Sequence, residues 1–113
     1  MKHIKAVIRP EKLNDVRDCL EKAGCYKGIM ISDIVGNGIQ KGITQVWRGE
    51  RYQVDLLPKV MIEMVVKDED VPIIKAVLLK CAKTGEFGDG KIFVYPVEEV
   101  IRIRTGEEGE AAL

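Results

Sequence analysis

The sequence is poor in aromatic residues and has no excess of charge of either sign. Aromatic residues make up 5% of the 113 residues, and 18 lysines and arginines balance 18 aspartates and glutamates. Nucleic-acid binding usually needs a basic face, and RNA-binding sheets need aromatic side chains for stacking, so an RNA-binding module is disfavoured. No apolar run reaches the length of a membrane span and no signal peptide is present, which predicts a cytoplasmic protein without nucleic-acid partners.

Histidine and cysteine are also scarce. The single histidine, His3, stands near the chain start, where we interpret it as a surface residue. An enzyme such as a small phosphotransferase would need a nucleophile or base, and no metal-binding carboxylate cluster accompanies Asp89, the one candidate base. The three cysteines, Cys19, Cys25 and Cys81, are an odd number without C-x-x-C spacing. We predict that they are reduced packing residues and form neither a disulfide nor a metal site.

What the sequence does contain is enough apolar material, 46%, for the core of one domain over residues 1–113. Residues 3–9 alternate as a strand that Pro10 ends. A helix then follows, with Gly24 as its stop; its apolar positions are Leu13, Val16, Leu20 and Ala23.

A second strand and helix repeat this order. Lys59 opens a strand over residues 60–66. Asp68 and Asp70 can cap the next helix, which tolerates Pro72 in its first turn and stops near residues 84–85. The apolar face of this helix comprises Ile73, Ile74, Val77, Leu78 and Cys81.

With further strands at residues 29–35 and 91–97, the two halves predict an α+β fold, the ferredoxin-like split βαβ sandwich (βαββαβ). The helices can cover one face of its sheet. The other face also has apolar side chains, among them Val7, Val65 and Phe93. A sheet that is apolar on both faces predicts burial of the second face against another copy of the chain.

Residues 36–57 show little periodicity and contain four glycines, at positions 36, 38, 42 and 49. A loop of this length inside a small domain is usually functional, so we predict a long protruding loop. Trp47 near its middle either folds back on the body or anchors a partner protein. Residues 101–113 form a C-terminal segment after the last strand.

The stretch Thr84-Gly85-Glu86-Phe87-Gly88-Asp89-Gly90-Lys91-Ile92-Phe93-Val94 suits a phosphate grip. Glycine lets backbone N–H groups approach an anion closely, and Lys91 adds a positive charge. The alternative is a glycine-rich loop that merely closes a hairpin. Downstream, Arg102 and Arg104 alternate with isoleucines, which predicts a strand with both guanidinium groups on one side and an anion between them.

These motifs resemble the PII signal-transduction proteins, the trimeric regulators of nitrogen assimilation. The resemblance rests on T-G-E-F-G-D-G-K-I-F-V, V-E-E-V-I-R-I-R-T-G, V-G-N-G-I-Q-K-G and Y-Q-V-D-L-L-P-K, and it runs from residue 1 to residue 113. It implies a homotrimer and a non-catalytic sensor of nitrogen, carbon and energy status. The target would be an ammonium transporter, reached through the long loop, or alternatively glutamine synthetase or another nitrogen-assimilation enzyme. The membrane would be approached only through a transporter partner.

The resemblance also assigns ligands to residues. ATP or ADP phosphates would bind Gly88, Asp89, Gly90, Lys91, Arg102 and Arg104. Val7, Val65 and Phe93 would bound the base pocket, and Glu63 would accept a hydrogen bond from the ribose unless it is an ordinary outward-facing carboxylate. The loop root would contribute Gly36, Gly38, Ile39, Gln40, Lys41 and Gly42. Lys59 would pair with 2-oxoglutarate, and Gln40 would ligate a shared Mg²⁺, although Lys59 and Lys41 also fit ordinary solvated lysines.

The sequence departs from the family pattern at several positions. Tyr52 stands where many members carry a uridylylated tyrosine, but Arg51 changes its flank. Ile39 replaces an arginine near the phosphates, and Met30 replaces a threonine near the adenine. Asn37 replaces a common aromatic residue, and one extra residue lies near residues 25–27. The ATP versus ADP preference therefore stays open.

Overall fold

The computed structural model describes residues 1–36, 44–47, 50–53 and 56–113, with side chains described for 1–36 and 56–113. In chain order its main elements are β1 (Lys2–Ile8), α1 (Leu13–Ala23), β2 (Met30–Gly36), β3 (Thr44–Trp47), β4 (Glu50–Gln53), β5 (Leu57–Val66), α2 (Val71–Cys81) and β6 (Lys91–Pro96). A short 3₁₀ helix, Gly109–Ala112, ends the described chain. No helix among the described residues has the length and apolar character needed to cross a membrane.

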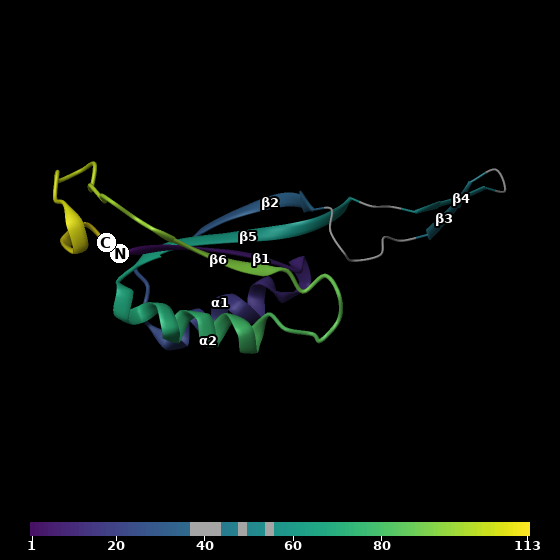
Figure 1. The fold of residues 1–113 in the computed structure, drawn as a ribbon, viewed down its shortest axis with the longest axis horizontal. Coiled ribbons are helices and arrows are strands. Elements are labelled where there is room, and N and C mark those ends of the chain that lie inside the picture. Colours follow the sequence, from purple (N-terminus) through teal and green to yellow (C-terminus); the bar gives the residue numbers. More distant parts are fainter. Residues whose placement is uncertain (37–43, 48–49, 54–55) are drawn as a thin grey trace.

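Four strands form one sheet in the order β2-β5-β1-β6, and each neighbouring pair is antiparallel. Figure 1 shows α1 and α2 side by side on one face of this sheet, while its other face has no helix. The order β1-α1-β2-β5-α2-β6 is the βαββαβ arrangement, so the predicted ferredoxin-like fold is confirmed.

The core lies between this sheet and the two helices. Strand residues alternate, so every second side chain points at the helices. The buried apolar side chains are Ile4, Ala6, Ile8, Val16, Leu20, Val60, Ile62, Met64, Val66, Ile74, Leu78 and Ala82. Ile73, which was predicted on the buried face of α2, is 46% exposed because the helical period turns Ile74 and Leu78 inward instead.

Helix ends were predicted with mixed success. Gly24 ends α1 with φ 66°, and its N–H bonds to the Leu20 carbonyl at 3.1 Å, as expected for a glycine stop. Asp70 occupies the N-cap position of α2, but its side chain makes no capping hydrogen bond. Asp68 instead accepts a 2.8 Å hydrogen bond from the N-terminal ammonium of Met1. The prediction of capping by these two aspartates was therefore wrong.

Cys19 and Cys81 form a disulfide that joins α1 to α2, so the prediction of reduced cysteines was wrong. The two helices lie against each other in the same layer, which brings residues 62 positions apart in the sequence together. Spacing along the chain carried no sign of this proximity. Cys25 remains a free thiol.

The segment predicted as an irregular loop contains two short antiparallel strands, β3 and β4, which pair with each other in a separate sheet. Figure 1 shows this hairpin apart from the four-stranded sheet. Strand β3 is rich in β-branched and aromatic residues, which favour strands, and β4 contains Tyr52. The glycine content of residues 36–57 obscured this local signal.

Candidate functional site

Gly90 lies against the end of β1 more closely than any other residue type allows. Its φ is +95°, and a Cβ built on it would lie 1.7 Å from the carbonyl oxygen of Val7. Gly88, two residues earlier, also has a positive φ of 99°. The link from α2 to β6 is therefore pressed onto the sheet in a conformation that L side chains rarely adopt. The glycine pattern of the sequence predicted a turn here. A residue with a side chain would not fit at Gly90.

The Asp89 carboxylate holds the same turn together. Its oxygens accept hydrogen bonds from the Thr84 hydroxyl at 2.5 Å, the Thr84 amide at 2.8 Å and the Gly85 amide at 2.9 Å. Arg9 Nε donates a further bond at 2.9 Å, and Arg9 Nη2 bonds the Phe87 carbonyl at 2.7 Å. These donors, the Thr84 hydroxyl first and Arg9 next, hold the pKa of Asp89 well below its usual range. A carboxylate so committed is a weak general base.

Lys59, at the start of β5, reaches the same turn. Its Nζ donates a 2.6 Å hydrogen bond to the Gly88 carbonyl. Desolvation, followed by the nearby charge of Arg9, lowers the pKa of Lys59. A Cβ at Gly36 would lie 3.2 Å from Lys59 Cγ, so the glycine leaves room for the lysine stem. Lys59 is thus not the solvated lysine that its sequence position also allowed.

The residues predicted to bind the base and ribose lie on the open face of the sheet. In the strand registers Val7 pairs with Met61 and Lys91, and Lys5 pairs with Glu63 and Phe93. Val65 follows one step further along β5, opposite His3. Alternation places all of these side chains on the face away from the helices. The predicted base-binding residues therefore share one surface, and Phe93 is 39% exposed on it.

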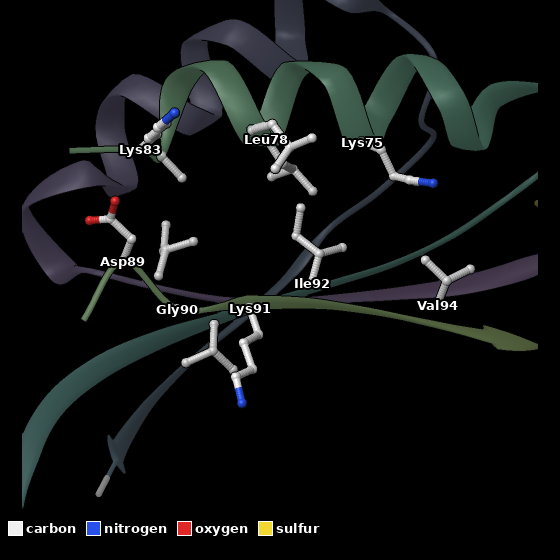
Figure 2. Close-up of a pocket in the computed structure, with 12 residues that line it drawn as sticks. Lys75, Leu78, Lys83, Asp89, Gly90, Lys91, Ile92 and Val94 are labelled. Carbon is white, nitrogen blue, oxygen red and sulfur yellow. The ribbon is translucent and has the colours of Figure 1, made fainter. Parts of the chain in front are cut away.

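A pocket of about 460 Å³ lies on the helix side of the sheet, between α2 and β6. Figure 2 shows Leu78 and Ile92 pointing into it, with Lys75 and Lys83 above and Lys91 pointing away on the other side of β6. Val7 lines this pocket together with the predicted phosphate-binding residues Asp89, Gly90 and Lys91, whereas Val65 and Phe93 do not. The pocket therefore coincides only in part with the predicted nucleotide site.

Arg102 and Arg104 do not lie on a strand, and that prediction was wrong. Residues 103–105 form a turn, closed by the Gly106 amide bonding to the Arg102 carbonyl at 2.7 Å. Arg102 Nη1 bonds Glu107 Oε1 at 2.8 Å, and its Nη2 lies 3.3 Å from the carbonyls of Ala111 and Leu113. A carboxylate of the same chain thus faces Arg102. Among the described residues Arg104 forms no ion pair.

These arginines lie at the wrong end of the sheet to meet the phosphate turn of their own chain. Strand β6 begins at Lys91 beside the turn and runs to Pro96, roughly 17 Å away at the usual strand rise. The Val97 amide then bonds the Met1 carbonyl at the other end of the sheet. Figure 1 shows the C-terminal segment at that end and the link from α2 to β6 at the opposite one. The structure therefore does not bring together all the predicted phosphate-binding residues.

Several predicted residues lie outside the described parts of the chain: Gly38, Ile39, Gln40, Lys41 and Gly42. The proposed Mg²⁺ ligand Gln40 is among them. Tyr52 falls in β4, but its side chain is not described. Among the described residues no cluster of histidine, cysteine, aspartate and glutamate could hold a metal ion.

Sequence reasoning missed three residues that shape the site: Arg9, Thr84 and Glu107. Arg9 lies between the end of β1 and Pro10, where a charged residue is unremarkable. Thr84 precedes Gly85 and stands five residues before Asp89, and no sequence signal marked it as a partner of that carboxylate. Glu107 follows the sequence Arg104-Thr105-Gly106. A turn at these residues would have predicted its ion pair with Arg102.

The chain matches known proteins along its whole length. The family model described as nitrogen regulatory protein P-II matches residues 1–107. Nitrogen regulatory protein P-II 2 of Methanothermobacter thermautotrophicus is 53% identical over 113 residues, covering 100% of this chain and 97% of the relative. Nitrogen regulatory protein P-II of Pasteurella multocida and P-II 1 of Escherichia coli K12 are 52% and 50% identical, each covering both chains completely. The chain belongs to the nitrogen regulatory protein P-II family, which consists of non-catalytic signal transducers, as the sequence resemblance predicted.

Proposed function

We propose that this P-II protein senses cellular energy and carbon status by binding ATP or ADP together with 2-oxoglutarate. It reports the result to a target protein through residues 36–57. In physical terms, each ligand combination has a different affinity for two conformations of that segment and shifts their populations.

The observation that carries the proposal is the close approach of Gly90 to the Val7 carbonyl. It fixes the turn of residues 88–91 against the sheet and places Lys91 on the open face. Backbone N–H groups beside glycines, together with a lysine ammonium, suit a polyphosphate, because charge-assisted hydrogen bonds are the strong ones. Asp89 supports the turn from within through Thr84 and Arg9 and need not touch the phosphates itself.

The open face supports the base and ribose assignments. Val7, Val65 and Phe93 offer apolar surface on three adjacent strands, and Glu63 supplies an acceptor between them. We propose that the nucleotide lies along this face with its phosphates toward Lys91. Lys59 would meet a carboxylate of 2-oxoglutarate, and Gln40 would ligate an Mg²⁺ ion shared with the phosphates.

A homotrimer would complete this site. Arg102 and Arg104 lie at the far end of the sheet from the phosphate turn, so their proposed phosphate contacts need a neighbouring copy. The open face also bears exposed apolar side chains, including Met30 at 58%, Phe93 at 39% and Tyr95 at 43%. Burial of such a face against other copies is favourable.

We propose that residues 1–113 act as a single domain in the cytoplasm, with residues 36–57 as the regulatory loop and 101–113 as the C-terminal segment. The leading target is an ammonium transporter, and glutamine synthetase or another nitrogen-assimilation enzyme is the alternative. Tyr52 is the candidate modification site. A pull-down eluted with ATP plus 2-oxoglutarate would identify the target and its releasing signal together.

Titration calorimetry with ATP tests the nucleotide site. Removing one charge-assisted contact costs roughly 1.5–3 kcal/mol, so Arg104→Ala should weaken ATP binding about ten-fold or more. Arg17→Ala, which removes an exposed arginine on α1, is the matched control and should leave binding unchanged. Unaltered ATP affinity in Arg104→Ala would remove this arginine from the site.

A further inference from the structure

His3 and Glu63 lie on neighbouring strands and meet on the open face of the sheet. His3 pairs with Val65 and Lys5 pairs with Glu63 in the ladder of β1 and β5, which makes His3 and Glu63 diagonal neighbours. His3 Nε2 lies 3.2 Å from Glu63 Oε1, and the two side chains are 27% and 20% exposed. His3 is therefore mostly covered and paired, unlike the surface residue that its place in the sequence suggested.

Tyr95 and Lys5 are the other groups beside His3, and Glu63 forms its ion pair within the described chain with His3. The Tyr95 ring, from β6, lies 5.8 Å from the imidazole between centroids. The ammonium of Lys5 lies 5.5 Å from the centroid of the same Tyr95 ring. Although the backbone of Lys5 pairs with Glu63, the ion pair that Glu63 forms within the described chain is with His3.

The contact between His3 Nε2 and Glu63 Oε1 is short, but it lacks the direction of a good hydrogen bond. His3 Nε2 is shielded from solvent and has no well-directed hydrogen bond among the described residues, although Glu63 Oε1 is within ion-pair distance. A shielded ring nitrogen without a partner is costly. The terminal torsion of a glutamate is soft, so a rotation of the Glu63 carboxylate suffices to align the bond.

We propose that His3 is a positioning residue for nucleotide binding: it holds one oxygen of Glu63, so that the other can accept a hydrogen bond from the ribose of a bound nucleotide. This inference rests on the proposed nucleotide-sensing function and adds a residue to it. His3 itself touches no ligand and acts through Glu63.

The hydrogen bond from His3 sets the strength of this positioning. The charged and polar groups that face His3 are Lys5 from β1, Glu63 from β5 and Tyr95 from β6. A hydrogen bond to an ionised carboxylate is roughly twice as strong as one between neutral groups, so an N–H donor at position 3 suffices to hold the Glu63 oxygen.

The test is ATP calorimetry on the wild type, His3→Gln and His3→Leu, at constant pH and Mg²⁺. Glutamine keeps an N–H donor, whereas leucine removes the donor. We expect His3→Leu to bind ATP about five-fold more weakly than the wild type. His3→Gln should stay within about two-fold of the wild type, since a donor at position 3 restores the contact with Glu63.

Lys91→Ala separates this inference from the function on which it rests. If Lys91→Ala loses ATP while both His3 variants bind like the wild type, the His3 inference is overturned and the nucleotide site stands. If Lys91→Ala also binds normally, the nucleotide function fails and the His3 inference fails with it. Should His3→Leu not fold, His3→Ala replaces it as the variant without a donor.

Discussion

Lys59 Nζ donates a 2.6 Å hydrogen bond to the Gly88 carbonyl, which joins the start of β5 to the glycine turn before β6. The same turn is held from β1 by the bond from Arg9 to Asp89 at 2.9 Å. Three strands are thereby tied at one end of the sheet, close to the segment that leads toward the long loop. Lys59 therefore lies between the proposed 2-oxoglutarate position and the turn that we propose grips the nucleotide.

The proposed site predicts coupled binding of two small ligands. Because the proposed Mg²⁺ ion joins 2-oxoglutarate to the ATP phosphates and Lys59 pairs with a carboxylate of 2-oxoglutarate, 2-oxoglutarate should bind well with Mg-ATP, poorly with ADP and not measurably to Lys59→Ala. By linkage, 2-oxoglutarate must tighten ATP by the factor by which ATP tightens 2-oxoglutarate. Calorimetry with ATP, ADP or neither, each with and without Mg²⁺, measures these factors.

The control for the lysine is Lys80→Ala, which removes an exposed lysine on α2 and should bind like the wild type. Equal 2-oxoglutarate affinity under all nucleotide and Mg²⁺ conditions would contradict the shared-ion mechanism.

Asp89 makes the stability of the fold depend on pH. Its pKa is lowered in the folded protein, first by the Thr84 hydroxyl and then by Arg9. A carboxylate with a lowered folded pKa stabilises the fold above its unfolded pKa of about 3.9, and this contribution is lost as the pH falls below that value. Asp89→Asn should therefore lower the melting temperature at pH 7, and the difference from the wild type should shrink as the pH falls from about 5 to 2. Thermal melts across this range measure it, with Asp18→Asn, an exposed residue of α1, as the control that shows no such trend.

Alanine substitutions at Gly90 and Gly85 separate the cost of backbone strain from the cost of steric overlap. Both have positive φ, +95° and +92°, but a Cβ at Gly85 meets nothing within 4 Å, whereas one at Gly90 would lie 1.7 Å from the Val7 oxygen. Gly85→Ala should lower the free energy of unfolding by about 1 kcal/mol. Gly90→Ala should lower it by more than about 4 kcal/mol, since backbone atoms must move. Urea unfolding of both variants gives the comparison, and equal losses would show that the contact with Val7 is not a constraint.

The sequence was sufficient for the parts of the structure that local pattern determines. Alternation located the strands of the four-stranded sheet but not β3 and β4, and the period of 3.6 located both helices. Gly24 and Gly90 marked turns because glycine favours positive φ. Contacts between residues that are far apart in the sequence could not be predicted from local pattern. Nothing in the spacing of Cys19 and Cys81 shows that the two helices lie together.

The candidate site likewise has residues that local pattern predicts and residues that it does not. The glycine turn and the apolar residues of the open face could be predicted, because each is a local motif or a strand alternation. The partner of Arg102 could not, because alternation with isoleucine indicated a strand, whereas Glu107 and the nearby carbonyls stabilise a turn. The covered position of His3 depends on Tyr95 and Glu63, which reach it only through the sheet.

The disulfide between Cys19 and Cys81 should stabilise the fold. It closes a loop across a sequence separation of 62 residues. In the chain-entropy model a loop of this size gives roughly 4 kcal/mol. Reduction, or the Cys19→Ser variant, should lower the denaturant midpoint of unfolding, whereas Cys25→Ser, which removes the free thiol, should not. An unchanged midpoint after reduction, checked by thiol counting, would show that the bridge does not contribute to stability in solution.

The placement of Lys91 and Arg104 at opposite ends of one sheet predicts that each nucleotide site takes Lys91 from one copy and Arg104 from its neighbour. Lys91→Ala and Arg104→Ala should each bind ATP about ten-fold more weakly when pure. Co-expression of the two variants should then restore wild-type affinity at about one interface in four, because in a randomly mixed ring that fraction joins an intact Lys91 to an intact Arg104. Light scattering must first show a trimer, and calorimetry of the mixed protein then resolves the tight fraction. If the mixture binds no better than the pure variants although mixed trimers form, both residues act within one chain or Arg104 is not in the site. A stable monomer at micromolar concentrations would contradict the shared site directly.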